Sequence, residues 1–497
     1  MTRLHVEDLL TTMLDDGSLS TWDLPVEDPP ITRGYRRELE AARARSGRDE
    51  AVTVGEGTIE GIRVAVLAGD PDFLGGSISV AAAERLTMAV ERATAESLPI
   101  VALPIGGGTR MQEGTVAFLQ MVKITGAVMA HKNQHLPYLV YLRHPTMGGV
   151  FASWGSLGHV TLAEPRALVG FLGPRVYEAL YGHAFPSGVQ LSENLAERGV
   201  IDRVCTPAEL PRELGRILRV MATRPSGSEP RESAPPIDVP DVPAWESVVR
   251  TRREDRPGLR DLLEVAASDV TMLNGTGDGE THPGSVLALA RLGNASCVIV
   301  GQDRDDQATP LDPAALREVR RGLRLARELR LPLVSVIDTP GAALSKEAEE
   351  RGLASEIART LSELLTLPSP TVSLLMGQGT GGIALSLTPA DRVVASQHAW
   401  LAPLPPEGAS AIVHRDTDHA PQMAETQGIR SIDLVRAGIV DRLVLEPDDP
   451  AAEREAFCGE LGRVLHDAVL GVVAMPRDER LERRRQRFRR LGLSGTE

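Results

Sequence analysis

The strongest constraint on the fold is an internal duplication. Landmarks of the first half recur in the second half at one offset, because each matched pair is 233 positions apart, as in 303 minus 70. The matched residues are Asp70 and Asp303, Pro99 and Pro332, Pro137 and Pro370, and Gly148 and Gly381. A later pair, Asp202 in RGVIDRV and Asp441 in AGIVDRL, is 239 apart, so the copies differ in length after the glycine pairs. A repeat of this length predicts one domain used twice.

A composition change marks the boundary between the copies. A chain of 497 residues is too long for one ordinary core. Residues 224–245 are rich in proline, serine and acidic residues, with too few apolar side chains to pack. We therefore predict an N-terminal domain at 1–223, a linker at 224–245 and a C-terminal domain at 246–497.

Each copy alternates short β-branched runs with longer amphipathic stretches. The pattern predicts strands at 64–68, 101–105, 139–142, 297–300, 333–337 and 371–375, and helices at 82–96, 115–130 and 315–329. Such alternation is typical of an α/β fold with a mostly parallel sheet and helices packed outside it. Since only 3% of the residues are aromatic, the core must consist of Val, Ile, Leu and Ala.

Charge and composition exclude several classes of function. A formal charge of -14 argues against nucleic acid as a partner. The basic run ERRRQRFRR at 482–490 is more typical of a solvated helix face. No apolar run reaches the roughly 18 residues that span a membrane, and the first residues lack a signal-peptide pattern, so we expect a cytoplasmic protein.

No pattern of metal ligands is present either. His131 and His135 are four positions apart, but the sequence lacks the glutamate of a zinc-binding HExxH motif and any third ligand nearby. We therefore expect no bound metal. Three cysteines far apart, Cys205, Cys297 and Cys458, are expected to be buried thiols.

Glycine-rich loops occupy the turns between predicted strands and helices. The first, GGGTRMQEG at 106–114, can expose backbone N–H groups to an anion, and Arg110 adds a positive charge. A tight turn would need similar glycines, so this loop alone is ambiguous. It has neither the GK[ST] of a P-loop nor the GxGxxG spacing of a dinucleotide site, which argues against ATP and NAD.

A second glycine loop occurs at equivalent places in both copies. Gly148 and Gly149 follow a predicted strand and precede an expected helix at 151–159, and Gly381 and Gly382 do the same before IALSLT. Paired N–H groups at such turns can form an oxyanion hole. Two loops in a duplicated fold therefore suggest two oxyanions.

At this point a family resemblance becomes specific. Residues 35–205 resemble the beta subunit of bacterial acetyl-CoA carboxylase carboxyltransferase, through FLGGS, GGGTRMQEG, PTMGGVFAS and AEPRALVGFLGPRV. Residues 329–445 resemble the alpha subunit of the same enzyme, through IDTPGA, EERG, PPEGASAI and DHAPQMAETQGI. The resemblance implies that the two subunits are fused in one chain, in the order beta then alpha.

The resemblance also implies a fold and a reaction. The fold would be two crotonase-like ββα spiral domains. The reaction would move a carboxyl group from carboxybiotin to the α-carbon of acetyl-CoA or another short acyl-CoA. A thioester enolate and a negatively charged biotin would both need stabilising, by Gly148 and Gly149 in one hole and by Gly381 and Gly382 in the other.

Binding residues and partners follow from the same resemblance. The acyl-CoA would lie along the N-terminal domain and biotin along the C-terminal domain, near the residues Gly75, Gly76, Gly107, Gly108 and Arg110, and Gly341 and Ala342, respectively. None of the three lysines is in the Met-Lys-Met setting of a biotinylated lysine. Carboxybiotin would therefore come from a separate biotin carboxylase and biotin carrier protein, and the chain would form a homo-oligomer, a dimer or larger.

Two alternatives remain open. A decarboxylase of malonyl- or methylmalonyl-type thioesters would use the N-terminal hole for the same enolate without biotin. A non-catalytic scaffold would assemble a carboxylase complex. The C-terminal glycine run ends in TGGI at 380–383, where the family more often has SGGA, and this is the best support for a scaffold.

Overall fold

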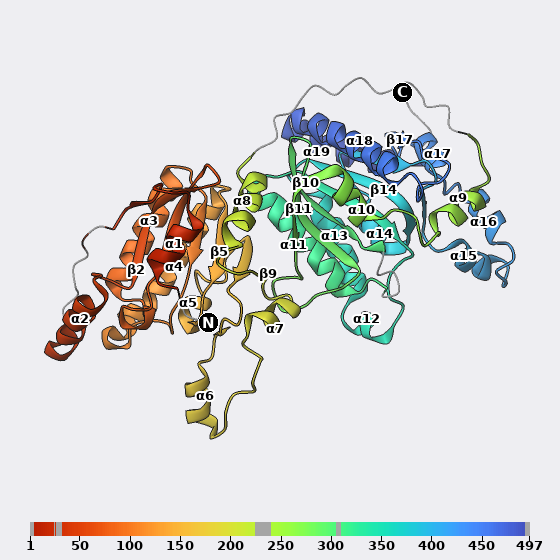
Figure 1. Ribbon diagram of the computed structural model, residues 1–497. Helices are drawn as coiled ribbons and strands as arrows, with labels where there is room; N and C mark the ends of the chain where they lie inside the picture. Colours follow the sequence, from red (N-terminus) through yellow and green to blue (C-terminus); the bar gives the residue numbers. More distant parts are fainter. Residues whose placement is uncertain (1–3, 24, 26–31, 224–239, 305–309, 493–497) are drawn as a thin grey trace. The chain divides into compact units, whose positions relative to one another are not determined.

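The computed structural model describes residues 4–23, 25, 32–223, 240–304 and 310–492. The chain divides into two compact units, Met1–Ala222 with Gly277–Gly279, and Thr223–Thr276 with Glu280–Glu497. Figure 1 shows a β-sheet with packed helices in each. Most of the predicted linker, residues 224–239, lies outside the described residues, and helix α9 already begins at Ala244.

The first unit contains a seven-stranded sheet in the order β1-β2-β3-β4-β5-β7-β9. The pairs β1-β2 and β2-β3 are antiparallel, and the pairs from β3 to β9 are parallel. The strands are β1 (Ser20–Thr21), β2 (Val52–Ile59), β3 (Ile62–Gly69), β4 (Ile100–Leu103), β5 (Tyr138–Leu142), β7 (Val160–Ala163) and β9 (Arg203–Val204), with a separate pair β6 (Thr146–Met147) and β8 (Val169–Gly170).

Helices cover both faces of this sheet. Apolar residues of α3 and α4 form one core with the strands, and α8 packs against β2 and β3 and also contacts α1. The helices are α1 (Val6–Met13), α2 (Arg33–Ser46), α3 (Val80–Ala95), α4 (Gly114–Asn133), α5 (Gly148–Phe151), α6 (Pro174–Tyr181), α7 (Ser192–Glu197) and α8 (Leu210–Met221), with 3-10 turns η1 (Leu74–Gly76) and η2 (Met111–Glu113).

The second unit repeats this arrangement, with sheet order β10-β11-β12-β13-β14-β15-β17 and β16 beside β14. Its first two pairs are antiparallel and the remainder parallel. The strands are β10 (Ala267–Leu273), β11 (Ser285–Leu292), β12 (Ala295–Gln302), β13 (Leu333–Thr339), β14 (Thr371–Thr380), β15 (Arg392–Ser396), β16 (Trp400–Ala402) and β17 (Arg442–Val444).

On one face of this sheet, α10 and the long α18 pack against the central strands; α11 contacts β11 and β12, and α14 contacts β13 and β14 (Figure 1). The helices are α9 (Ala244–Thr251), α10 (Leu259–Ala266), α11 (Pro313–Leu329), α12 (Lys346–Glu350), α13 (Leu353–Leu365), α14 (Gly381–Leu387), α15 (Pro406–Val413), α16 (Ala420–Thr426), α17 (Ser431–Arg436), α18 (Arg454–Ala474) and α19 (Arg477–Arg490).

The predicted duplication is present at the level of strand register. Ala65 pairs with Ile100 between β3 and β4, and Val298 pairs with Leu333 between β12 and β13, with both residues shifted by 233. Strands β2 and β3 likewise coincide with β11 and β12 after the same shift. The predicted strands and the helices expected at 82–96, 115–130 and 315–329 are confirmed within a few residues.

Two local predictions are wrong. The helix expected at 151–159 begins earlier and is short, since α5 spans Gly148–Phe151 and residues 152–156 form turns. The basic run at 482–490 is helical, but it is not solvated throughout. Arg484 is 1% exposed and binds both carboxylate oxygens of Asp391, and the nearby Arg480 also pairs with Asp391. Part of the basic charge therefore anchors α19 to its own unit.

The three cysteines are buried free thiols, as predicted. Burial raises the pKa of each thiol to about 12, so the reactive thiolate is disfavoured at neutral pH. In the described part of the chain, no helix combines the length and apolar character needed to cross a membrane.

His131, weighed above as a metal ligand, instead predicts acid sensitivity. Its Nε2 lies 3.2 Å from the carbonyl of Pro137, and burial lowers its pKa to about 4. The unfolded chain, with a histidine pKa of about 6.5, binds the proton at higher pH than the folded chain does. The free energy of unfolding should therefore fall as the pH drops from about 6.5 to about 4, by about 3 kcal/mol.

Urea titrations of the wild type and of His131→Gln at pH 7 and pH 4 measure this contribution. The wild type should lose about 3 kcal/mol more than the variant over that range. Equal losses in the two proteins would show that His131 is not the group responsible.

Candidate functional site

The predicted N-terminal site residues meet at one edge of the first sheet. Three loops follow the parallel strands β3, β4 and β5, and backbone hydrogen bonds join them. Met147 donates to the Gly106 carbonyl at 2.9 Å, and Ile78 donates to the Gly108 carbonyl at 3.0 Å. Since parallel strands end at a common edge, the sheet brings the glycine loops together as the sequence predicts.

Close backbone approach explains the glycines of these loops. A Cβ on Gly106 would lie 2.3 Å from the Gly76 carbonyl oxygen, and φ of Gly106 is +115°. A Cβ on Gly148 would lie 3.1 Å from the Gly107 oxygen, at φ +58°. Any side chain at these positions must push the loops apart.

The loop backbone is accessible in places. Gly75 and Gly107 are exposed, and Gly148 and Gly149 are partly exposed at the start of α5. The first N–H groups of a helix have no acceptor within it and carry partial positive charge. The edge can therefore present N–H donors to an oxyanion.

Arg110 is bound inside the protein. It is 1% exposed, and its guanidinium pairs with Glu50 at 2.5 and 3.0 Å. The other contacts are with the hydroxyl and carbonyl oxygens of Ser77, at 3.3 and 2.8 Å, and the Tyr35 hydroxyl at 3.2 Å. These five contacts match the five N–H donors of arginine. The geometry supports a role in holding the loops, and direct contact with an acyl-CoA stays a prediction.

Sequence reasoning missed the partners of Arg110. Glu50 precedes β2 and Tyr35 lies on α2, both far from the glycine motif along the chain. Glu113 was weighed as an acid or base, but its two oxygens accept hydrogen bonds from the Tyr35 hydroxyl at 2.5 Å and from the Val80 amide at 2.7 Å. No local pattern around Glu50 or Tyr35 signals these contacts.

The second unit has the same loop conformation. Gly341 has φ +126° and its counterpart Gly108 has φ +125°; Gly381 has φ +71° and Gly148 has φ +58°. The bridge between Leu311 and Ala342 repeats the bridge between Ile78 and Thr109, again shifted by 233. The sequence-predicted residues Gly341, Ala342, Gly381 and Gly382 are thus brought to one edge of this sheet, and all four are partly exposed.

A different ion pair supports the loops of the second unit. Arg304 donates to Asp338 at 2.7 Å, and the other Asp338 oxygen accepts the Gln378 amide at 2.9 Å. A Cβ on Gly377 would lie 2.4 Å from Asp338 Oδ1, so this contact requires glycine there. The position that corresponds to Arg110 is Ala343, so the two units stabilise equivalent loops with unrelated residues.

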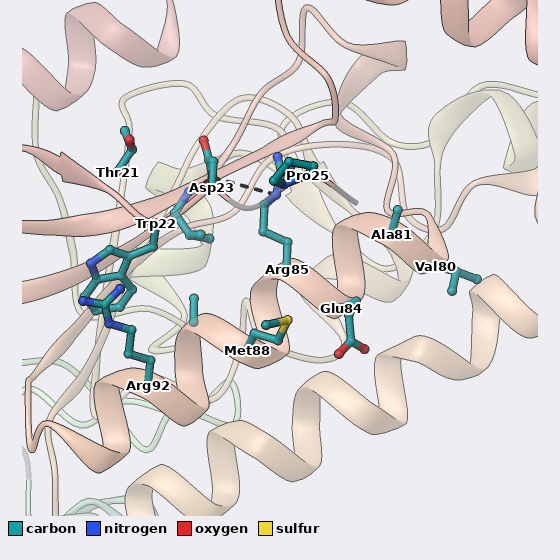
Figure 2. Close-up of a pocket in the computed structure, with 12 residues that line it drawn as sticks. Thr21, Trp22, Asp23, Pro25, Val80, Ala81, Glu84, Arg85, Met88 and Arg92 are labelled. Atoms are coloured by element: carbon teal, nitrogen blue, oxygen red, sulfur yellow. Dashed lines mark hydrogen bonds and ion pairs between the residues drawn. The ribbon is translucent and has the colours of Figure 1, made fainter. Parts of the chain in front are cut away.

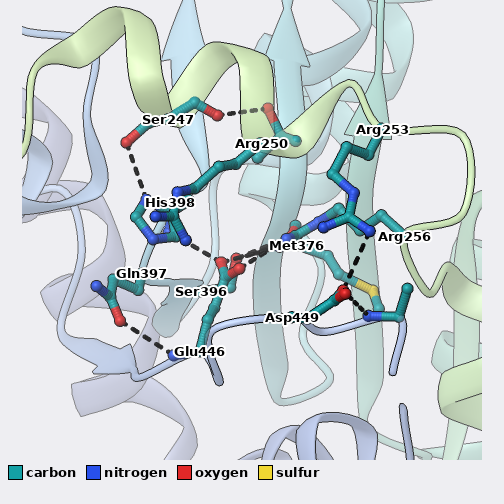
Figure 3. A network of polar contacts seen from close by, with 12 residues as sticks. Ser247, Arg250, Arg253, Arg256, Met376, Ser396, Gln397, His398, Glu446 and Asp449 are labelled. Carbon is teal, nitrogen blue, oxygen red and sulfur yellow. Dashed lines mark hydrogen bonds and ion pairs between the residues drawn. The ribbon is translucent and has the colours of Figure 1, made fainter. Parts of the chain in front are cut away.

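Further charged groups of this unit are also paired. The hydrogen bonds of Arg252, at 2.5 and 3.1 Å, lower the pKa of Glu407, which disfavours the role of general acid weighed above. Figure 3 shows Arg256 bound to Glu446 at 2.6 and 2.9 Å. Burial alone would raise the pKa of Glu446, but the charge and hydrogen bonds of Arg256 hold it below its ordinary value. This pair anchors the segment after α9 to the sheet.

A pocket of about 560 Å³ lies elsewhere in the first unit. It is lined by residues 21–23 and 25, by Val54 and by one side of α3, with the Arg92 guanidinium over the Trp22 ring at 4.2 Å (Figure 2). None of the predicted site residues lines it. The glycine loops therefore form a site distinct from this pocket.

Comparisons with known proteins agree with this geometry. The family model described as the carboxyl transferase domain matches residues 32–466. A probable biotin-dependent acyl-coenzyme A carboxylase beta3 subunit of Mycobacterium tuberculosis (strain ATCC 25618 / H37Rv) is 56% identical over 495 residues, covering 99% of each chain. The acetyl-coenzyme A carboxylase carboxyl transferase subunits beta/alpha of Salinispora tropica are 35% identical over 525 residues, covering 99% of this chain and 91% of that one.

A solved structure supports the fold. The crystal structure of transcarboxylase 12S, whose title describes a hexamer assembly with methylmalonyl-coenzyme A bound, matches with a TM-score of 0.75 at 19% identity. The match covers 95% of this chain and 91% of that one and confirms the predicted α/β fold of two crotonase-like domains. Because the family match spans both units and the relatives align almost end to end, the chain belongs to the carboxyl transferase domain family, as a carboxyltransferase of acyl-CoA carboxylases.

Proposed function

We propose that this chain transfers a carboxyl group from carboxybiotin, carried on a separate protein, to the α-carbon of acetyl-CoA or another short acyl-CoA. The observation that carries the proposal is the repeated loop geometry, in which both units present glycine N–H groups at equivalent helix starts, Gly148 and Gly381. A transfer between two groups that each develop an oxyanion needs two such sites.

The chain's own residues would act mainly through the backbone. N–H groups of Gly148 and Gly149 would donate to one oxyanion, and those of Gly381 and Gly382 to the other. Such preorganised donors stabilise charge that develops in the transition state, at a value of about 10² to 10³ in rate for each donor. Acyl-CoA would lie against Gly75, Gly76, Gly107 and Gly108.

The biotin side fits a flat, uncharged ring. The loop residues Gly341, Ala342, Gly381 and Gly382 carry no side chain larger than a methyl group and leave backbone donors partly exposed. Carboxybiotin supplies the activated carboxyl group when it is bound. The chain has no biotinylation motif, so we propose a biotin carboxylase and a biotin carrier protein as partners.

An exposed apolar face suggests a homo-oligomer. On α4, Val116, Phe118, Leu119 and Val122 are 54 to 69% exposed. The positions 233 residues later hold Glu349, Arg351, Gly352 and Ser355, so the duplicated fold does not itself require apolar residues there. Clustered apolar surface of this kind marks a protein interface. We propose that a second copy of the chain covers this face of α4.

Val122→Glu should dissociate the oligomer, because the interface would bury an unpaired charge. We expect the dissociation constant to rise by at least about two orders of magnitude, as sedimentation velocity can measure. Val249→Glu on α9, a half-exposed valine, is the matched control. Unchanged association of Val122→Glu would argue that α4 is not the interface.

The reverse reaction tests the proposed function directly. Purified protein is incubated with malonyl-CoA, with and without free biotin, and acetyl-CoA and carboxybiotin are followed. Biotin-dependent turnover is the expected result. Turnover that is equal without biotin would favour the decarboxylase, and no turnover with malonyl-CoA or methylmalonyl-CoA would favour a scaffold.

A further inference from the structure

We propose that Tyr35, on a helix that precedes the ββα core, is a positioning residue for the glycine loops of the first unit. It acts through Arg110 and Glu113, neither of which Tyr35 adjoins in sequence. The inference rests on the proposed function, because the loops it positions are the ones proposed to hold the acyl-CoA and its enolate.

Tyr35 is held in place by its own helix. Thr32 caps α2, accepting a hydrogen bond from the Tyr35 amide at 3.3 Å, and the Tyr35 ring packs in a small core with Leu39 and Phe73. The side chain is buried, and burial and Glu113 raise the pKa of the phenol. The hydroxyl therefore keeps its proton and remains a donor.

The Tyr35 hydroxyl joins two groups that do not reach each other. It donates to Glu113 at 2.5 Å and accepts from Arg110 Nη1 at 3.2 Å. The distance from Arg110 Nη1 to Glu113 Oε1 is 3.9 Å, too long for a direct hydrogen bond. The phenol oxygen is thus the link between the guanidinium and this carboxylate.

Through these two residues, Tyr35 reaches each loop of the site. The Arg110 guanidinium donates to the Ser77 carbonyl, and its own amide donates to the Ile78 carbonyl, which fixes the loop after β4 against the loop after β3. Glu113 accepts from the Val80 amide at the start of α3 and directly precedes α4. The loop held by Arg110 in turn contacts the Gly148 turn, because Gly106 accepts from Met147.

The network has no counterpart in the second unit. The positions 233 residues after Glu50, Arg110 and Glu113 hold Pro283, Ala343 and Lys346. The device is therefore not a requirement of the duplicated fold. It belongs to the unit on which we place the acyl-CoA, as expected of a residue set that tunes that site.

Loss of the link should affect catalysis more than binding. N–H donors stabilise an oxyanion only when they are correctly placed, and a displacement of about 1 Å costs on the order of 10²-fold in rate. Tyr35 itself contacts neither substrate in this arrangement. Tyr35→Phe should therefore lower kcat about 10- to 100-fold, with KM for the acyl-CoA nearly unchanged.

The experiment uses the full chain in the biotin-dependent reverse reaction, with kcat, KM and the thermal unfolding midpoint measured for each variant. Glu113→Gln weakens the same link from the other side, so the result does not depend on the folding of one variant. Tyr141→Phe is the matched control, because it removes a buried hydroxyl that donates to the Cys205 carbonyl at 3.1 Å, away from the loops.

A double-mutant cycle distinguishes positioning from unrelated damage. The Tyr35→Phe and Glu113→Gln effects on kcat should be strongly non-additive, the double variant losing little more than the worse single variant. Multiplying effects, a rise in KM at constant kcat, or wild-type kinetics of Tyr35→Phe would each overturn the inference. Absence of biotin-dependent turnover in the wild type would instead count against the proposed function.

Discussion

Gly148→Ala is expected to lower kcat of biotin-dependent carboxyl transfer by about 10²- to 10³-fold. Gly148 has φ +58°, where a Cβ is strained, and that Cβ would lie 3.1 Å from the Gly107 carbonyl oxygen. Relief of this contact must move either the start of α5 or the loop after β4. Both movements displace the N–H groups proposed to hold the oxyanion.

Gly61→Ala is the control for the backbone cost alone. Gly61 has φ +78° in the hairpin between β2 and β3, and nothing lies within 4 Å of its ideal Cβ. Both variants pay a similar conformational cost, but only Gly148→Ala disturbs the loops. Steady-state kinetics in the reverse direction measure the difference. Similar kcat values for the two variants would contradict an oxyanion hole at Gly148.

Glu50→Ala is expected to lower the free energy of unfolding by about 3 to 5 kcal/mol, because it leaves the Arg110 guanidinium buried without its counter-charge. Both members of this pair are 1% exposed, so water cannot replace the lost carboxylate. The Ala51 amide and the Ser79 hydroxyl would also lose their acceptor. Guanidinium titration of the full chain measures the loss.

Glu84→Ala provides the comparison at the surface. Glu84 pairs with Lys123, and both side chains are substantially exposed, so its removal should cost less than about 1 kcal/mol. Replacing both buried partners, as in Glu50→Leu with Arg110→Met, should recover part of the stability that Glu50→Ala loses. Equal stability of Glu50→Ala and Glu84→Ala would refute the view that the buried pair holds the unit together.

Local sequence was sufficient to predict the loops that form the candidate site. Gly106 to Gly108 and Gly148 with Gly149 each follow a strand pattern, and parallel strands end at one edge, so their meeting could be predicted. The same reasoning placed Gly341 with Gly381 in the second unit. The early end of α5 could not be predicted, since small residues after Phe151 suit a helix and a turn alike.

Charged residues were predicted less well, because their partners are distant in sequence. Arg110 suggested an anion-binding group until the fold brought Glu50 and Tyr35 against it, 60 and 75 positions away. Arg484 appeared in a run typical of an exposed face, yet Asp391 lies 93 positions before it and binds it in the interior. An isolated acidic residue carries no sign of which cation it will meet.

The sequence by itself determined the duplicated α/β fold, the positions of the glycine loops and the family, because repeat spacing, hydrophobic periodicity and long motifs are written along the chain. Only the tertiary structure decided which side chains hold those loops. Arg110 joins Glu50 and Tyr35 in one unit, and Arg304 joins Asp338 in the other. Buried ion pairs form between residues that folding brings together, and their energy depends on desolvation and geometry that no local pattern records.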